Sequence, residues 1–357
     1  MPKFHTLKVR EVRRETADCV SVSFEVPMEL KEEYQFIPGQ HLTLKTDLEG
    51  GEVRRSYSIC TSPNENDLRV AIKKVQGGQF SAFANELLQP GDSLDVMTPL
   101  GSFHTPLDSG QQKHYVAFAA GSGITPIIAI LKAVLETEPK SHFTLFYGNR
   151  ATESIIFRDQ IEDLKNKYLQ RLSIHHVLSQ EDPGADLFYG RIDAGKCKLF
   201  FSRLLDPEDV DEFFLCGPES MIESVKGTLE DLGVPRSKIH LELFTSPVGK
   251  LGVTDKKWTP PVQPVLSKVT ITLDGNTFTF DHTSSGAPIL DAAQKAGADL
   301  PFACKGGVCC TCKAKLLKGE VDMEVNYGLE PDEVEKGYVL TCQSHPKTDV
   351  VVLSFDE

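Results

Sequence analysis

Four cysteines near the end of the chain are spaced so that its last quarter must fold around them. Cys304, Cys309 and Cys312 follow the pattern C-x4-C-x2-C, and Cys342 comes after a longer gap. The two glycines inside the first interval permit backbone angles that a Cβ atom would forbid. A loop that brings four thiols together therefore determines this part of the fold.

Four thiolates with this spacing bind a [2Fe–2S] cluster, which transfers single electrons. A zinc ribbon would need two C-x2-C pairs, and a disulfide framework is typical of small secreted chains. Cys310 lies inside the loop at a position that the four-ligand pattern does not use. We interpret Cys310 as a small buried residue, and an exchange of roles with Cys309 is the alternative. The sequence thus predicts an electron-transfer protein.

Length and composition limit the remaining possibilities. A chain of 357 residues, 40% hydrophobic and 25% charged, suits two or three globular domains. The longest apolar stretch is interrupted by glycines and a proline, so it predicts a strand, a loop and a helix rather than a membrane span. No signal peptide is evident, so nine cysteines predict reduced thiols in the cytoplasm. A net charge of −13 argues against nucleic acid and anionic membranes as partners.

The first two segments differ in their apolar pattern. Residues 1–110 contain short alternating strands separated by turns such as Pro38-Gly39, which predicts an antiparallel β-barrel. Residues 111–245 alternate apolar strands with helical stretches, which predicts a parallel sheet covered on both faces. The expected strands are 115–120, 143–147, 174–178, 213–216 and 239–243, and the expected helices start at Thr125, near Phe157 and at Glu219.

Two further segments complete the chain. Residues 246–266 contain four prolines and no periodicity, and we interpret them as a linker. An arm packed on the surface of one domain is the alternative, and Trp258 favours partial packing of this kind. Residues 267–357 begin with two alternating strands around Asp274-Gly275, a hairpin signal, and continue with a helix over 288–296. The expected fold class is multidomain: a β-barrel, an α/β domain and a small α+β domain.

Three glycine-containing stretches end strands of the α/β segment. A glycine loop between a strand and a helix lets the backbone approach a pyrophosphate, although the motif alone also fits a plain tight turn. Ligands of open α/β sheets collect at the carboxyl ends of strands, so all three stretches should face one cleft. The candidate nucleotide-binding residues are Gly121, Ser122, Gly123, Thr125, Pro126, Asn149, Arg150, Cys216, Gly217 and Pro218.

The barrel segment carries two motifs that suit a flavin. An arginine for phosphate, a tyrosine ring and a serine hydroxyl occur together in one strand, and a Gly-Gly turn into a helix makes a second phosphate cradle. Either motif alone fits a plain strand or turn, so their value lies in their occurrence together. The candidate residues are Arg55, Tyr57, Ser58, Lys73, Gly77, Gly78 and Ser81.

The order of these motifs resembles the ferredoxin–NADP reductase superfamily, and the cysteine loop is similar to that of plant-type ferredoxins. Their fusion resembles the reductase components of multicomponent oxygenases. The resemblance implies FAD on Arg55, Tyr57 and Ser58, and its pyrophosphate near the Gly-Gly turn. It implies a nicotinamide beside Cys216, with Ser58 and Cys216 next to the hydride transfer, and a β-grasp fold around the cluster.

The stretches 54–60, 187–193 and 323–333 extend the resemblance to the reductase subunits of phenylacetyl-CoA epoxidase (ring 1,2-monooxygenase) complexes. This implies electron transfer from NAD(P)H through FAD and the cluster to a di-iron oxygenase of phenylacetate catabolism. The alternatives are the reductase of another oxygenase, such as a steroid or alkane hydroxylase, and a redox sensor without catalysis. Arg150 and Arg158 favour NADPH over NADH, because cations there suit a 2′-phosphate. The alternatives are that Glu153, the nearest acid, takes the ribose hydroxyls, and that both arginines are only solvated.

An acidic run occurs in the last segment. Interleaved apolar residues suggest a docking surface for a basic face of the oxygenase, and a solvated surface is the alternative. The six acids are Asp322, Glu324, Glu330, Asp332, Glu333 and Glu335.

Overall fold

The computed structural model describes residues 3–244 and 263–357. One compact unit spans Phe4–Glu242, and a second contains Leu243–Glu357. Most of the predicted linker, including Trp258, lies outside the described residues. Within those residues, no helix combines the length and the apolar character needed to cross a membrane.

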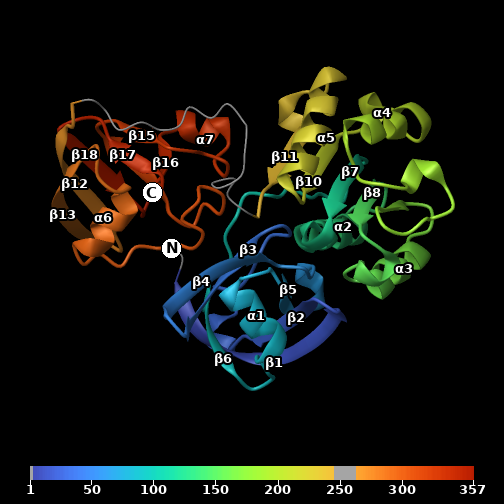
Figure 1. Cartoon of the computed structure of the whole chain (residues 1–357), viewed down its shortest axis with the longest axis horizontal. Helices are drawn as coiled ribbons and strands as arrows, with labels where there is room; N and C mark the ends of the chain where they lie inside the picture. The colour runs from blue at the N-terminus through green and yellow to red at the C-terminus, as the bar shows by residue number, and fades with distance from the viewer. Residues whose placement is uncertain (1–2, 245–262) are drawn as a thin grey trace. The chain divides into compact units, whose positions relative to one another are not determined.

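Six antiparallel strands form the start of the first unit (Figure 1). They are β1 (Phe4–Thr16), β2 (Cys19–Glu25), β3 (His41–Leu48), β4 (Gly51–Ser58), β5 (Leu68–Lys73) and β6 (Ser93–Met97), in the order β4-β3-β6-β1-β2-β5. An antiparallel bridge between Ile59 and Val70 links the two edges of this sheet. Alternating side chains such as Leu42 and Leu44 are fully buried. The predicted antiparallel barrel is confirmed, and α1 (Gln79–Glu86) packs with it.

A five-stranded parallel sheet completes the first unit. Its strands are β7 (His114–Ala120), β8 (His142–Asn149), β9 (Leu172–Leu178), β10 (Glu212–Cys216) and β11 (Ile239–Glu242), in the order β11-β10-β7-β8-β9. The helices α2 (Ile124–Thr137) and α3 (Arg158–Lys167) lie on one face, and α4 (Ala194–Arg203) and α5 (Glu219–Asp231) lie on the other (Figure 1). The strand order reverses between β7 and β10, which makes their carboxyl ends the expected ligand-binding edge.

The second unit is a mixed sheet with short helices. The sheet has the order β13-β12-β18-β14-β16, and β12 pairs in parallel with β18. Asp274 and Gly275 both have positive φ, as the predicted two-residue hairpin turn requires. The α+β class is confirmed. The elements are β12 (Leu266–Leu273), β13 (Asn276–Thr283), α6 (Ile289–Lys295), β14 (Lys313–Lys318), β15 (Val321–Met323), α7 (Pro331–Glu335), β16 (Tyr338–Leu340), β17 (Ser344–Pro346) and β18 (Val350–Ser354).

Candidate functional site

The three strand-end stretches of the parallel sheet meet at the reversal of strand order. Gly121–Gly123 forms a single 3-10 turn that leads directly into α2. A Cβ atom on Gly123 would lie 2.0 Å from the carbonyl oxygen of Cys216, so only glycine fits there. A Cβ atom on Gly217 would lie 3.1 Å from the backbone nitrogen of Ala120. These contacts bring the stretches after β7 and β10 together.

The stretch after β8 joins the same edge. The Tyr147 hydroxyl donates a 2.9 Å hydrogen bond to the carbonyl oxygen of Gly121. Asn149 Nδ2 is buried and makes no well-formed hydrogen bond to another of the described residues. A buried donor without a partner is rare, and at this edge it suits an acceptor of a bound nucleotide. Thr125 Oγ1 donates to the carbonyl oxygen of Ser122 at 3.0 Å, which closes the first turn of α2.

A second set of side chains joins the barrel to this edge. Ser58 Oγ at the end of β4 donates to Glu242 Oε2 at 3.1 Å, and Cys216 Sγ lies 3.9 Å from the same oxygen. Burial raises the pKa of Glu242 to about 8, so the carboxyl group holds a proton at neutral pH. Burial also raises the pKa of the Cys216 thiol. The three side chains therefore form an uncharged set where the resemblance places flavin and nicotinamide.

The glycine turn of the barrel is built like a phosphate cradle. Gly77 has φ +74°, and Gly78 is the N-cap of α1. Ser81 Oγ accepts from the backbone nitrogen of Val75 at 3.1 Å and donates to the carbonyl oxygen of Gly78 at 3.2 Å. The serine thus holds the turn in shape. A Cβ atom on Gly121 would lie 3.9 Å from Lys73 Nζ, so this cation lies close to the nucleotide loop as well.

The predicted flavin strand presents its residues in different ways. Arg55 is exposed and donates to the carbonyl oxygen of Arg54 at 2.7 Å, whereas Ser58 is buried. The Tyr57 ring lies 5.6 Å from the Phe80 ring of α1. An exposed cation, a half-buried ring and an open helix start on adjacent elements fit a flavin dinucleotide.

The four predicted cluster ligands form two pairs. The Cys304 and Cys309 thiols are hydrogen-bonded to each other, as are those of Cys312 and Cys342. The backbone nitrogen of Gly306 also donates to Cys304 Sγ at 3.3 Å. Among the described residues, no three His, Cys, Asp or Glu side chains are grouped to hold a metal ion. Three of the four sulfurs come from the loop before β14, and Cys342 comes from the segment between β16 and β17. Two sulfur pairs fit a two-iron cluster, in which each iron takes two thiolates.

The surroundings favour the thiolate form at one sulfur of each pair, Cys304 and Cys342, and raise the pKa of its partner, Cys309 or Cys312. The hydrogen bond from the Cys309 thiol, helped by backbone N–H groups, holds the pKa of Cys304 below its ordinary value. The Cys312 thiol lowers the pKa of Cys342 in the same way. In contrast, burial raises the pKa of Cys310 to about 12. A Cβ atom on Gly328 would lie 2.5 Å from Cys310 Sγ, so this sulfur packs against the neighbouring chain segment.

Comparisons with known proteins match three separate parts of the chain. Family models match residues 6–105 (oxidoreductase FAD-binding domain), 118–227 (oxidoreductase NAD-binding domain) and 271–347 (2Fe-2S iron-sulfur cluster binding domain). A 1,2-phenylacetyl-CoA epoxidase subunit from Escherichia coli (strain K12) is 47% identical over 356 residues, covering 100% of this chain and 99% of that protein.

The chain belongs to the family of this epoxidase subunit. It is an oxidoreductase with FAD-binding, NAD-binding and 2Fe-2S domains. A more distant member of the wider group is the ferredoxin reductase component of 3-ketosteroid-9-alpha-monooxygenase from Rhodococcus rhodochrous, which is 33% identical and covers 98% of this chain and 96% of that protein. The structure of phthalate dioxygenase reductase shares the fold, with a TM-score of 0.57 and 24% identity over 99% of this chain and 98% of that one.

Glu242 is a residue of this site that no sequence motif indicates. It ends β11, and the parallel register places it directly beside Cys216 at the end of β10. A pairing of the predicted strands 213–216 and 239–243 would have brought the two residues together. The hydrogen bond to Ser58, 184 positions earlier in the chain, has no local signal in the sequence.

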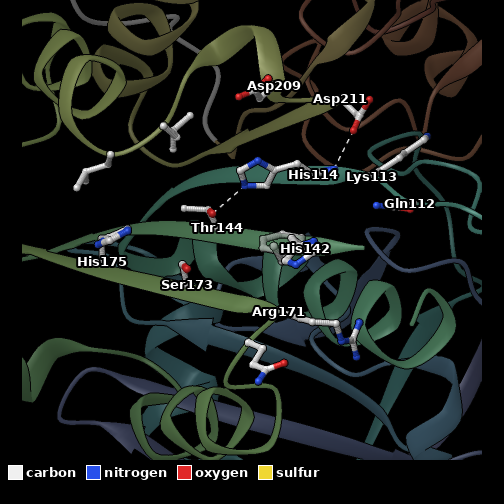
Figure 2. Close-up of a pocket in the computed structure, with 14 residues that line it drawn as sticks. Gln112, Lys113, His114, His142, Thr144, Arg171, Ser173, His175, Asp209 and Asp211 are labelled. Atoms are coloured by element: carbon white, nitrogen blue, oxygen red, sulfur yellow. Dashed lines mark hydrogen bonds between the residues drawn. The ribbon is translucent and has the colours of Figure 1, made fainter. Parts of the chain in front are cut away.

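A cavity of about 460 Å³ lies at the other end of the same strands (Figure 2). His114 Nε2 lies 2.9 Å from Thr144 Oγ1, and the backbone nitrogen of His114 donates to Asp211 Oδ2 at 2.8 Å. Lys113 at its rim forms an ion pair with Glu212. Two of the hydrogen bonds thus join polar groups of this cavity to each other, and none of the predicted nucleotide or flavin residues lines it.

Proposed function

We propose that this chain is the reductase of a phenylacetyl-CoA epoxidase, and that it delivers electrons to a di-iron oxygenase component. A bound FAD would accept the hydrogen and two electrons of the nicotinamide C–H bond, leave NAD(P)⁺, and pass the electrons singly to the cluster. The uncharged set of Ser58, Glu242 and Cys216 carries the proposal. It lies beside the nucleotide loop, where a flavin and a nicotinamide would have to meet.

We assign roles to the chain's own residues on this basis. Ser58 and Cys216 line the position of hydride transfer, and Glu242 holds a proton there and fixes the Ser58 hydroxyl. The exposed Arg55 and the turn at Gly77 would bind the flavin phosphates. The proposed domain limits are 1–110, 111–245 and 267–357, with a linker over 246–266. The proposed compartment is the cytoplasm, because cluster ligands must stay reduced.

We further propose that NADPH is the preferred nucleotide. Arg150 follows β8 and Arg158 begins α3, and both are exposed to solvent. The nearby carboxylate of Glu181 accepts hydrogen bonds from the Thr152 backbone nitrogen and hydroxyl, at 2.6 and 2.7 Å. Both oxygens of Glu181 are thus engaged by the protein rather than presented to ribose hydroxyls.

The nucleotide proposal is tested by steady-state kinetics with an artificial acceptor. The ratio of kcat/KM for NADPH to that for NADH should exceed one, and Arg150→Ala should lower it by about tenfold through loss of a phosphate contact. Equal kcat/KM values for the two nucleotides in the native protein would end the idea.

The function itself is tested by electron delivery. The protein is reduced with NADPH without oxygen and then mixed, under oxygen, with a candidate oxygenase and its substrate. We expect product from phenylacetyl-CoA with the matching epoxidase. The 3-ketosteroid relative makes a steroid hydroxylase the second candidate partner. Failure to oxidise NAD(P)H with any artificial acceptor would instead favour a redox sensor.

A further inference from the structure

Helix α2 contains a lysine in its buried core. Every residue from Ile124 to Leu135 is buried, and Lys132 is the one charged residue among them. Only 3% of the lysine is exposed. Its Nζ donates to the two carboxylate oxygens of Glu65 at 2.9 and 3.0 Å, and lies 3.4 Å from the carbonyl oxygen of Cys60. A buried cation is costly unless it is paired in this way.

The partners of Lys132 belong to the barrel. Glu65 closes a short 3-10 turn, Pro63–Glu65, between β4 and β5, and its Oε2 also accepts from the backbone nitrogen of Ser62 at 2.7 Å. Cys60 is two residues beyond Ser58, the barrel residue of the hydride-transfer set. Helix α2, in turn, starts directly after the nucleotide loop. The ion pair therefore joins the segment that carries Ser58 to the helix that carries the nucleotide loop.

Much of this contact is apolar. Cys60 and Ala71 of the barrel share one buried cluster with Ile127, Ile128 and Leu131 of α2. Apolar contacts are non-directional, so they allow small sliding movements at little cost. Three polar contacts give this surface its direction: the Lys132–Glu65 ion pair, and hydrogen bonds from Ser62 Oγ and Asn64 Nδ2 to Glu136 Oε2 of α2 at 2.7 and 3.0 Å. Glu136 is exposed whereas Lys132 is buried, so the ion pair is the directional contact that water weakens least.

We propose that the Lys132–Glu65 ion pair is a positioning device for hydride transfer. This inference rests on the proposed function. The reacting atoms of a hydride donor and acceptor must approach to about 3–3.5 Å, and a misplacement of about 1 Å from a distant change can cost about 100-fold in rate. Neither residue contacts the reacting groups. The pair acts by holding Ser58 and its strand at a fixed distance from Gly121–Gly123.

The test replaces Lys132 with methionine, which has a similar length and no charge. Glu65 is about one third exposed, so water can solvate it in Lys132→Met and the protein should fold. FAD content and cluster absorbance should match the native protein. At saturating NADPH, flavin reduction in stopped flow should slow by at least about tenfold, with an unchanged half-saturating concentration. The long-wavelength charge-transfer band of nicotinamide against flavin should weaken.

Two further variants make the result specific. Lys113, which lines the cavity of Figure 2, forms another ion pair of the same unit, with Glu212. In Lys113→Met the flavin should be reduced at close to the native rate. Glu65→Gln should slow flavin reduction, and Lys132→Met with Glu65→Gln should be no slower than the slower single variant, because the two residues act as one unit. If Lys132→Met does not fold, the rate of flavin reduction in Glu65→Gln decides the test.

Two results would show that the Lys132–Glu65 pair only stabilises the fold. One is a native rate of flavin reduction and a native charge-transfer band in Lys132→Met. The other is a decrease of the flavin reduction rate in Lys113→Met as large as that in Lys132→Met. A native protein that does not oxidise NADPH would instead overturn the proposed function.

Discussion

A carboxyl group at the end of β11 is a stronger base than an ordinary glutamate, because burial disfavours its charged form. The pKa of Glu242 is about 8 in the folded chain, against 4.5 for a free side chain. The folded state therefore binds a proton that the unfolded state releases between these values. The contribution of this group to stability is complete below pH 4.5 and is lost as the pH rises through 8.

Glu242→Gln should remove this pH dependence. Glutamine keeps the shape and the hydrogen bond from Ser58 but carries no titrating proton. The native protein should lose stability relative to the variant between about pH 4.5 and 8.5, by roughly 3–5 kcal/mol at most. Thermal melts of the FAD-loaded proteins across this range test it. Glu49→Gln at an exposed site is the control. If the melting temperatures of the native protein and Glu242→Gln change with pH in the same way, the prediction is wrong.

The cysteines of the second unit should differ in their effect on the cluster when each is replaced. Cys304→Ser, Cys309→Ser, Cys312→Ser or Cys342→Ser should each abolish the cluster absorbance, because each removes one thiolate of the two pairs. FAD binding and its reduction by NADPH should remain, because they belong to the other unit. Cys310→Ala should keep the cluster, since that thiol packs against Gly328. Visible spectra and iron content decide; cluster loss in Cys310→Ala would make Cys310 a ligand.

At the level of elements, patterns that repeat locally are predictable from the sequence, and features that depend on tertiary contact are not. The predicted strand 115–120 and the predicted helix from Thr125 are within a residue of β7 and α2, because apolar runs and a glycine loop mark them. Helix α4 is absent from the predicted elements, since Gly195 and two lysines interrupt its pattern. It forms because Phe200 stacks on Phe146, with ring centroids 4.4 Å apart, and because Asp193 caps its start.

The glycines at the ends of β7 and β10 should differ in their tolerance of a methyl group. Gly123→Ala places Cβ 2.0 Å from a backbone carbonyl of β10, whereas the closest atom to Cβ in Gly217→Ala is Met221 Cε, the end of a flexible side chain, at 2.7 Å. The kcat/KM for NADPH should fall by at least about 100-fold in Gly123→Ala and by less in Gly217→Ala. Gly227→Ala in α5 meets no atom within 4 Å and should stabilise the fold by about 0.5–1 kcal/mol. Equal kcat/KM in the first two variants would contradict this prediction.

For the whole molecule, net charge acts on a partner at longer range than any other property. The net charge is −13, and the acidic run of the second unit predicts docking to a basic surface. The structure shows that several of these acids have local partners. Glu324 contacts His345, Glu333 pairs with Lys313, and Asp332 pairs with Lys336. Replacing Glu333 would also remove a cap of α7, so it would test folding together with docking.

Asp322 and Glu335 make a cleaner test, because both are exposed and neither lies in these pairs. The double variant Asp322→Lys with Glu335→Lys should slow electron delivery to the oxygenase several-fold, because charge steering raises association rates. The rate of electron delivery should also depend less steeply on salt concentration than in the native protein. Glu29→Lys with Glu32→Lys on the barrel makes the same change in net charge and should leave the salt slope unchanged, and ferricyanide reduction should be unchanged in both proteins. If the two double variants deliver electrons alike at every ionic strength, the acidic run is a solvated surface and docking lies elsewhere.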